Sequence, residues 1–470
     1  MRLILGGLLS VLLLSQLHAT TTDEITTLVD QGHWRQAQQE IAQELAQTNL
    51  SFSTQEELRF QADRMLRIRR DFSQTRDQVY QKIRATMPGV TDQQLAQWEQ
   101  SGAIEFLDID GTHWYFNKAA DNVFRLAPEA KAFKAAQHPS HAEMDDLLND
   151  VHEYVAGYDQ TKSPWHSPQT WQVTYTLSVP AGTVPPGEII RAWLPWPHSG
   201  NRQSNIRLLA TDPPQFLPAP TNEALASVYL EKPALTNAPT EFKLVFKYTS
   251  TAYYQPIDPA IVVPAATNDP ALTPFMGEEP PHIVFDDAFK TISTKVIGDE
   301  TNPYRKAQRI FEWVFRNVTW TTAREYSTIT CLPELALGMH HGDCGMKTMT
   351  FMTLCRLNGI PARWETGWVV SDNSDMHDWC AIYLAPYGWV PVDVTRGVLP
   401  AKTEAEKWFY LGGMDPARLV VNTDFNQPLY PAKTHFRSEI VDFQRGEVEW
   451  RGGNLYFNQW GWNFDAKRIK

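Results

Sequence analysis

Three side chains of the types that perform thiol chemistry follow one another in the chain: Cys344, His377 and Asp393. Cys344 stands in the motif GDCG at residues 342–345, where a loop is expected to become a helix. Backbone N–H groups at a helix N-terminus favour a thiolate over a thiol. A thiolate attacks amide and ester carbonyls, and a nearby imidazole can protonate the leaving amine. The pattern therefore predicts a nucleophilic cysteine.

The histidine and the aspartate are expected to meet across two neighbouring strands. His377 begins a predicted strand, and Asp393 lies on the next strand after a short turn. Strands joined so closely pair antiparallel by default, so the carboxylate would orient the imidazole and stabilise the imidazolium. Each residue also has a plainer interpretation. Cys344 could be a cysteine buried in a helix. His377 could be a solvated residue at a strand edge, and Asp393 could cap a turn at the end of a strand.

The wider pattern resembles the core of the transglutaminase-like superfamily. The motifs that carry the resemblance are LALGMHHGDC at 335–344, LCRLNGIPAR at 354–363, HDW at 377–379, GWVPVD at 388–393 and YLGGMD at 410–415. The resemblance extends over residues 285–425. It implies a papain-like α+β core in which Cys344 is the nucleophile, His377 the general base and acid, and Asp393 the orienting residue.

Acyl transfer also needs hydrogen-bond donors aimed at the developing oxyanion. The backbone N–H of Cys344 supplies one donor by its position. The resemblance implies that a side chain upstream supplies the second, and Trp320 and Tyr326 are the candidates. Each of them is equally suited to be a packing aromatic.

No cofactor and no metal ion are expected. His340 and His341 stand close to the nucleophile, but adjacent residues point apart and no further Cys or His at suitable spacing completes a zinc set. We find no acidic loop with calcium-ligand spacing. Three aspartates stand near these motifs: Asp343, Asp375 and Asp378. They would either give the site a negative charge or be solvated carboxylates in loops.

The cysteines are clustered in one stretch of the chain, whereas a disulfide scaffold would spread them along it. The set is Cys331, Cys344, Cys355 and Cys380. If Cys344 stays a free thiol, at most one disulfide can form among the other three, and the sequence does not decide whether it does.

Length and composition describe a folded protein with several domains. A chain of 470 residues exceeds what one hydrophobic core usually supports. The hydrophobic fraction of 43% and the 17 tryptophans are typical of a folded protein. A net charge of -12 argues against nucleic acid or anionic lipid as the main partner, because phosphate contacts need clustered Lys and Arg.

The N-terminus has the pattern of a secretory signal peptide. A basic start is followed by the apolar run LILGGLLSVLLL and by a small residue, Ala19, which predicts a signal peptide over residues 1–19. The run is short for a membrane span, so no stable membrane insertion is expected after cleavage, although a retained signal anchor is the alternative. The expected location is the periplasm or the outside of the cell.

The remaining sequence predicts an α+β protein of several parts. Residues 20–160 are mainly helical, with Thr54 and Thr91 as predicted helix caps and a small hairpin that turns at Asp110-Gly111. Apolar and polar residues alternate in 165–255, which indicates a β-sandwich. The other predicted parts are a Pro-rich linker at 256–284, the catalytic core at 285–425 and a β-rich C-terminal extension at 426–470.

These observations predict an exported cysteine-nucleophile enzyme that acts on amide bonds of a peptide, protein or glycopeptide through a thioester. Hydrolysis is favoured because water is abundant. One alternative is a protein-glutamine gamma-glutamyltransferase, which would pass the acyl group to an amine. Another is a non-catalytic binding or assembly protein on the same fold. The oligomeric state is not determined by the sequence.

Overall fold

The computed structural model describes residues 22–137, 142–200, 202–371 and 373–469, so the predicted signal peptide lies outside the described residues. The chain divides into two compact units, Met1–Pro139 with Thr322–Thr328, and Ser140–Thr321 with Ile329–Lys470. Helices and antiparallel sheets both occur, which confirms the predicted α+β class. Within the described ranges, every helix is too short or too polar to reach across a bilayer.

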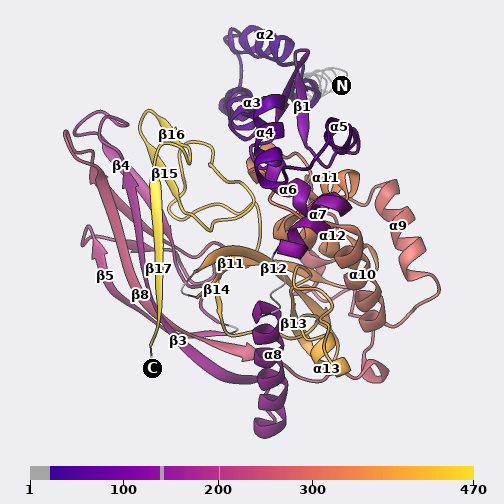
Figure 1. Cartoon of the computed structure of the whole chain (residues 1–470). Coiled ribbons are helices and arrows are strands. Elements are labelled where there is room, and N and C mark those ends of the chain that lie inside the picture. Colours follow the sequence, from indigo (N-terminus) through magenta and orange to yellow (C-terminus); the bar gives the residue numbers. More distant parts are fainter. Residues whose placement is uncertain (1–21, 138–141, 201, 372, 470) are drawn as a thin grey trace, which may run out of the picture. The chain divides into compact units, whose positions relative to one another are not determined.

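The N-terminal unit is mainly helical, as its apolar periodicity predicts (Figure 1). Its elements are α2 (Trp34–Leu45), α3 (Phe52–Asp71), α4 (Arg76–Thr86), α5 (Asp92–Gln100), α6 (Ala119–Leu126), α7 (Pro128–Gln137) and the strands β1 (Phe106–Ile109) and β2 (Thr112–Tyr115). The cap predicted at Thr91 is confirmed, because its side chain accepts from the N–H of Gln94. The cap predicted at Thr54 is wrong. Ser51 caps α3 instead and accepts from the N–H of Thr54.

The predicted hairpin is confirmed between β1 and β2. Asp110 and Gly111 have φ values of 51° and 85°, the left-handed conformations that a two-residue hairpin turn requires. The β1 and β2 strands pair antiparallel around this turn.

A short loop from the middle of the chain belongs to the N-terminal unit. Its residues 322–328 end in the 3-10 helix η3 (Tyr326–Thr328). Asp71 accepts a hydrogen bond from the N–H of Glu325 at 3.0 Å, and Asn122 donates to the carbonyl of Thr322 at 2.8 Å. The sequence contains no local signal for this exchange, because the partners are far away along the chain.

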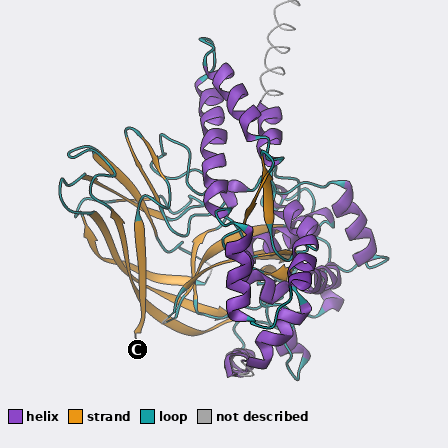
Figure 2. Ribbon diagram, turned by 45° about the horizontal axis from the view of Figure 1, so that its top comes forward, coloured by secondary structure: helices purple, strands orange, loops and turns teal. Residues whose placement is uncertain are grey.

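The second unit contains two antiparallel sheets that combine strands from 165–253 with strands from the C-terminal segment. One sheet has the order β16-β15-β4-β7-β6 and the other has the order β17-β3-β8-β5. The strands are β3 (Trp165–Val179), β4 (Ile189–Pro195), β5 (Gln203–Asp212), β6 (Leu217–Pro218), β7 (Ser227–Pro233), β8 (Thr240–Tyr253), β15 (Glu447–Trp450), β16 (Gly453–Leu455) and β17 (Gly461–Ile469). Long strands of both sheets run as curved ribbons in Figure 2. Inward-facing apolar residues of both sheets form one buried cluster.

The C-terminal segment completes both of these sheets. The β15 strand pairs with β4, and β17 pairs with β3 along its whole length. The β-rich pattern predicted for 426–470 therefore corresponds to strands whose partners lie far back in the sequence.

A third sheet with helices beside it forms the rest of this unit. The sheet has the order β13-β12-β11-β14, and all its neighbours are antiparallel. The strands are β11 (Ala362–Val369), β12 (Asp375–Leu384), β13 (Gly388–Val392) and β14 (Arg418–Asn422). The helices and short strands are α8 (Ala142–Thr161), α9 (Asp287–Ile297), α10 (Pro303–Asn317), α11 (Leu332–Met339), α12 (Cys344–Leu357), α13 (Glu404–Lys407), β9 (Thr319–Trp320) and β10 (His341–Gly342). The α12 helix contacts β11 and β12 on one side and α10 on another (Figure 1).

One glycine allows two strands of this sheet to approach closely. Gly367 of β11 lies opposite His377 of β12 and opposite Val420 of β14. A Cβ atom at Gly367 would stand 1.8 Å from the carbonyl oxygen of Leu419. Only glycine fits there without a shift of the β14 backbone.

The Pro-rich stretch at 256–284 is irregular apart from two single turns, η1 (Pro259–Ile261) and η2 (Thr273–Phe275). It is nevertheless anchored to the helices and the sheet. Asn302, the cap of α10, donates to the carbonyl of Pro259 at 2.7 Å, and Arg356 of α12 pairs with Glu279 at 2.9 Å.

Candidate active site

Cys344 is the first residue of α12, as the sequence predicts. Asp343 caps the helix, and its carboxylate accepts a hydrogen bond from the N–H of Met346 at 3.2 Å. Gly342 is needed because a Cβ there would stand 2.8 Å from the Cβ of Met346. The thiol is half-buried and sits where the amide groups of the first helical turn are free of intrahelical partners.

The α12 helix is fixed against the strand that carries His377. Thr348, one turn after Cys344, donates to the carbonyl of Asp378 at 3.3 Å. Lys347 donates to the carbonyl of Val318 at 2.8 Å. Both side chains are buried. The Thr348 bond holds the start of α12 beside β12, and the Lys347 bond holds it to the end of α10.

His377 and Asp393 form the hydrogen bond that the strand pairing predicts. The β12 and β13 strands are antiparallel, and Asp393 follows the last residue of β13. The Nε2 of His377 lies 2.8 Å from the Oδ2 of Asp393, and the Asp393 carboxylate is fully buried. Because the carboxylate accepts, Nε2 carries a proton, and Nδ1 is the ring nitrogen left to take one.

Asp393 is held ionised by its surroundings. Its Oδ1 accepts from the N–H groups of Thr395 and Arg396, and Arg418 lies 3.0 Å from its Oδ2. Burial by itself would raise the pKa of Asp393, but His377 and Arg418 outweigh it and hold that pKa well below its ordinary value. An ionised, immobile carboxylate favours one orientation of the imidazole.

The hydrogen bond of the thiol goes to Asp378, the neighbour of His377 along β12. Cys344 Sγ donates to Asp378 Oδ2 at 3.3 Å. Burial, followed by the charges of Asp378 and Asp343, raises the pKa of the Cys344 thiol well above its ordinary value. The thiolate expected from the helix terminus alone is therefore disfavoured in this arrangement, because burial and two neighbouring carboxylates both favour the neutral thiol.

Asp378 is fixed by residues from two distant parts of the chain. Its Oδ1 accepts from Gln444 Nε2 at 2.8 Å and from the hydroxyl of Thr366. Gln444 also donates to the carbonyl of His377 at 3.1 Å. The sequence indicated Asp378 only as one of several negative charges near the site. It gave no reason to consider Gln444, which lies beyond the predicted core at 285–425.

The two candidates for the second oxyanion donor belong to different compact units of the chain. Trp320 ends β9, which pairs in parallel with β10, and the register sets Trp320 opposite Gly342. Tyr326 belongs to the N-terminal unit and is buried in η3. The backbone pairing thus sets Trp320 beside Gly342, which is two residues before the nucleophile in the chain, and the role of Trp320 as the second donor stays a prediction.

The other residues weighed from the sequence have structural partners. His341 is buried and its Nδ1 lies 2.9 Å from the hydroxyl of Thr321, while His340 closes α11 in a left-handed conformation. Burial, then the neighbouring His340, lowers the pKa of His341 to about 4. Asp375 is exposed at the start of β12. In the part of the chain that the structure describes, no group of three or more His, Cys, Asp or Glu side chains is arranged to hold a metal ion.

The remaining cysteines are free thiols buried in the core. No disulfide joins Cys331, Cys355 or Cys380, all of which lie in described residues. Burial raises the pKa of Cys331 to about 12 and raises the pKa values of Cys355 and Cys380 well above the ordinary range. Cys344 is the one with partial exposure, and so the one a reagent can reach in the folded protein.

Comparison with known proteins supports the resemblance seen in the sequence. Residues 290–394 match the family model of the transglutaminase-like superfamily. An uncharacterized protein of Haemophilus influenzae is 31% identical over 141 residues, which cover 24% of this chain and 37% of that protein. The chain thus spans little more than a third of this relative.

Two solved structures are similar to larger parts of the chain. A candidate cysteine protease from Cytophaga hutchinsonii covers 65% of this chain and 92% of its own, at 16% identity and a TM-score of 0.44. The periplasmic domain of TgpA from Pseudomonas aeruginosa covers 56% of this chain and 94% of its own, at 14% identity and a TM-score of 0.26. Both TM-scores are below 0.5, so the likeness to the transglutaminase-like superfamily rests on the family-model match at residues 290–394.

Proposed function

We propose that this protein, whose residues 290–394 form a transglutaminase-like domain, is an exported enzyme that transfers acyl groups through a cysteine thioester. Its substrates would be amide bonds of peptides, proteins or glycopeptides, with water as the favoured acceptor. The observation that carries the proposal is the 2.8 Å hydrogen bond between His377 and a buried, ionised Asp393, beside a helix that begins with Cys344.

The chemistry divides among the three residues. The sulfur of Cys344 attacks the substrate carbonyl as its proton passes to Nδ1 of His377, and the imidazolium then protonates the leaving amine. The thioester is next attacked by water, whose proton returns through His377, so that an acid and the free thiol are released. Asp393 holds the ring and stabilises its cationic form. The Cys344 N–H, with a donor from Trp320, would bind the oxyanion.

The contact between Cys344 and Asp378 gives the proposed cycle a resting state. The thiol must leave its hydrogen bond to Asp378 before His377 can accept its proton. A bound substrate that displaces the thiol from the carboxylate would therefore start the reaction, and an empty site would keep the sulfur protonated and weakly reactive.

Export is proposed from the N-terminal sequence. The run that ends at Ala19 has the length and flanks of a signal peptide. N-terminal sequencing of the protein recovered from the periplasm or the medium tests this. A mature chain that starts soon after Ala19 supports export, and a chain that keeps Met1 in a membrane fraction contradicts cleavage.

The test of the reaction class is a covalent intermediate. The purified full chain is incubated with a peptide mixture, quenched in acid and digested, and mass spectrometry locates any acyl group. The proposal predicts acylation at Cys344, abolished in Cys344→Ala and unchanged in Cys331→Ala, a matched control at a buried thiol. Acylation elsewhere, or none with any peptide, counts against an acyl-transfer enzyme and in favour of a binding protein.

Hydrolysis and transfer to an amine are separated by the same assay with methylamine added. Release of free acid at an undiminished rate supports hydrolysis. Incorporation of methylamine at glutamine side chains would instead support a protein-glutamine gamma-glutamyltransferase.

A further inference from the structure

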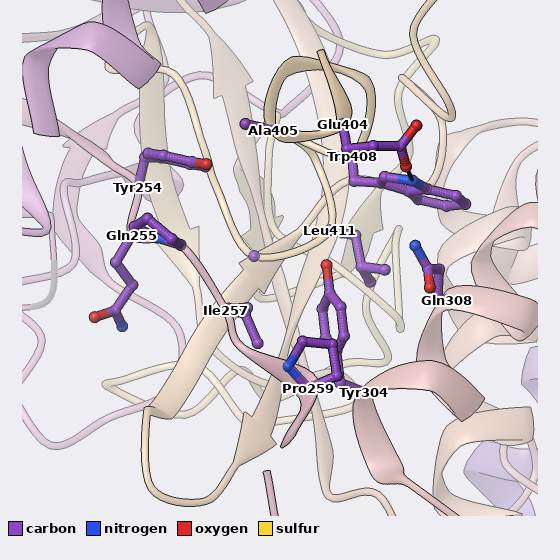
Figure 3. Close-up of a pocket in the computed structure, with 12 residues that line it drawn as sticks. Tyr254, Gln255, Ile257, Pro259, Tyr304, Gln308, Glu404, Ala405, Trp408 and Leu411 are labelled. Carbon is purple, nitrogen blue, oxygen red and sulfur yellow. Dashed lines mark hydrogen bonds between the residues drawn. The ribbon is translucent and has the colours of Figure 1, made fainter. Parts of the chain in front are cut away.

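A pocket in the second unit lies apart from the cysteine. Its volume is about 300 Å³, at the lower end of the range for small-molecule sites. It is formed by the stretch that follows β8, by one face of α10, and by α13 with the segment after it (Figure 3). Three stretches distant in the sequence thus converge on one cavity.

Two buried tyrosines point their hydroxyl groups into this pocket. Tyr254 and Tyr304 are 8% and 9% exposed, and Figure 3 shows both phenol oxygens directed toward the cavity. Gln308 lies one turn after Tyr304 on α10 and adds an amide to the same wall. Within the described residues, none of these three side chains has a hydrogen-bond partner. Gln308 is half-buried and both phenol oxygens open into the cavity, so these polar atoms are available to a ligand that displaces solvent.

The rest of the wall is aromatic and aliphatic. Trp408 is half-buried, and its Nε1 donates to Glu404 at 2.9 Å, which fixes the plane of the indole at the rim (Figure 3). Ile257 and Leu411 add apolar surface to the lining. A ligand therefore meets flat apolar faces together with uncharged donors and acceptors.

The lining of the pocket disfavours an anionic ligand. No Lys or Arg is among its lining residues, all of which are described. Glu404, the one charged residue of the lining, already accepts from Trp408 and from Lys407, which lies 3.2 Å away. The carboxylate is thus paired and exposed, and it offers little attraction to a cation.

We propose that this pocket binds a neutral saccharide. A sugar ring has an apolar C–H face that packs on indole and phenol rings, and hydroxyl groups that both donate and accept. Those are the groups that Trp408 and the unpaired atoms of Tyr254, Tyr304 and Gln308 require. An extended peptide would instead pair with a free strand edge, and no residue of a named strand is among the described residues that line the cavity.

The pocket shares backbone with the candidate active site. Leu411 forms a β-bridge with Val392, and the N–H of Gly412 donates to the carbonyl of Pro391 at 2.9 Å. The N–H of Asp393 donates to the carbonyl of Tyr410 at 2.9 Å. A saccharide bound in the pocket would rest on the segment that borders Asp393. Saccharide binding itself does not depend on the chemistry proposed for Cys344.

The test is calorimetric titration of the full chain with N,N′-diacetylchitobiose and with cellobiose. Tyr304→Phe removes one hydroxyl and Gln308→Leu removes one amide, and neither changes the size of the side chain much. Loss of one neutral hydrogen bond should weaken binding about tenfold. Tyr383→Phe, at a tyrosine outside the pocket, is the matched control, and Cys344→Ala should bind as the wild type does.

The outcomes separate the possibilities. Binding of either disaccharide that weakens in both pocket variants and persists in the control supports the proposal. Binding that the pocket variants leave unchanged would place the saccharide elsewhere and overturn it. Binding of neither disaccharide, or of a capped alanine dipeptide in their place, would also overturn it. Saccharide binding without any acylation of Cys344 would leave the pocket assigned and the proposed enzyme refuted.

Discussion

Replacement of Asp378 by Asn should make Cys344 more acidic and more reactive. The exchange removes one negative charge beside the sulfur while keeping the shape of the side chain. The carbonyl of the new amide side chain can still accept from Gln444 and Thr366, and its NH₂ group can then donate to the thiolate. The variant thus reverses the polarity of the contact and leaves the surrounding network in place.

The size of the effect follows from the distance. Sulfur and carboxylate are 3.3 Å apart, and two unit charges at that separation interact by about 5 kcal/mol at an effective dielectric constant of about 20. Because the thiol is half-buried, solvent screening reduces this, and a single neighbouring charge typically shifts a pKa by about 1–3 units. We expect the pKa of Cys344 to fall by that amount in Asp378→Asn.

The assay is the rate of alkylation by iodoacetamide as a function of pH, with the adduct at Cys344 measured by mass spectrometry. The buried cysteines Cys331, Cys355 and Cys380 do not interfere in the folded protein. The thiolate fraction rises about tenfold for each unit by which the pKa falls, while nucleophilicity falls about threefold, so the rate near neutral pH should rise about 3- to 30-fold.

The matched control is Asp375→Asn, which makes the same charge change at an exposed position of the same strand. It should leave the midpoint of the pH profile almost unchanged. If Asp378→Asn has the wild-type midpoint, or a higher one, the contact does not govern the thiol and the proposed resting state is wrong.

Three further predictions concern a site residue, a close approach of two strands and a buried histidine. Asp393→Asn should lower turnover strongly, by loss of the ring orientation, while a circular dichroism spectrum stays the same; wild-type kcat in that variant would remove Asp393 from the catalytic set. Gly367→Ala should destabilise the fold by about 2 kcal/mol or more in urea unfolding, because the new methyl group meets the Leu419 carbonyl, and an unchanged midpoint would contradict the close approach of β11 and β14. Burial lowers the pKa of His282 to about 4. Between about pH 6.5 and 4 the unfolded protein therefore binds a proton at this histidine that the folded protein does not bind. The free energy of unfolding should fall as the pH drops through this range. His282→Gln should lose about 2–3 kcal/mol of that pH dependence in unfolding experiments, and an equal slope in both proteins would refute the assignment.

Local signals in the sequence were sufficient for several elements. Asp343 caps α12 and Gly342 precedes it, so the start of the helix at Cys344 follows from short-range chemistry. The short turn between β12 and β13 leaves antiparallel pairing as the simple outcome, and that pairing sets Asp393 beside His377.

Contacts between distant parts of the chain could not be predicted in the same way. Gln444 reaches Asp378 from the C-terminal segment, and no local pattern encodes that partner. The loop at 322–328 joins the N-terminal unit through Asp71 and Asn122, although it lies between two elements of the second unit. The raised pKa of Cys344 has the same origin. The start of a helix can be predicted from the sequence, whereas the burial of the thiol and its contact with Asp378 arise from tertiary packing.

The central claim is that Cys344 is a nucleophile that depends on His377, and p-nitrophenyl acetate tests it without knowledge of the natural substrate. The account predicts a burst of p-nitrophenolate equal to the amount of enzyme, an acetyl group on Cys344, and a greatly slowed burst in His377→Ala. Absence of the burst, or acetylation of Cys344 at the same rate in His377→Ala, would contradict it.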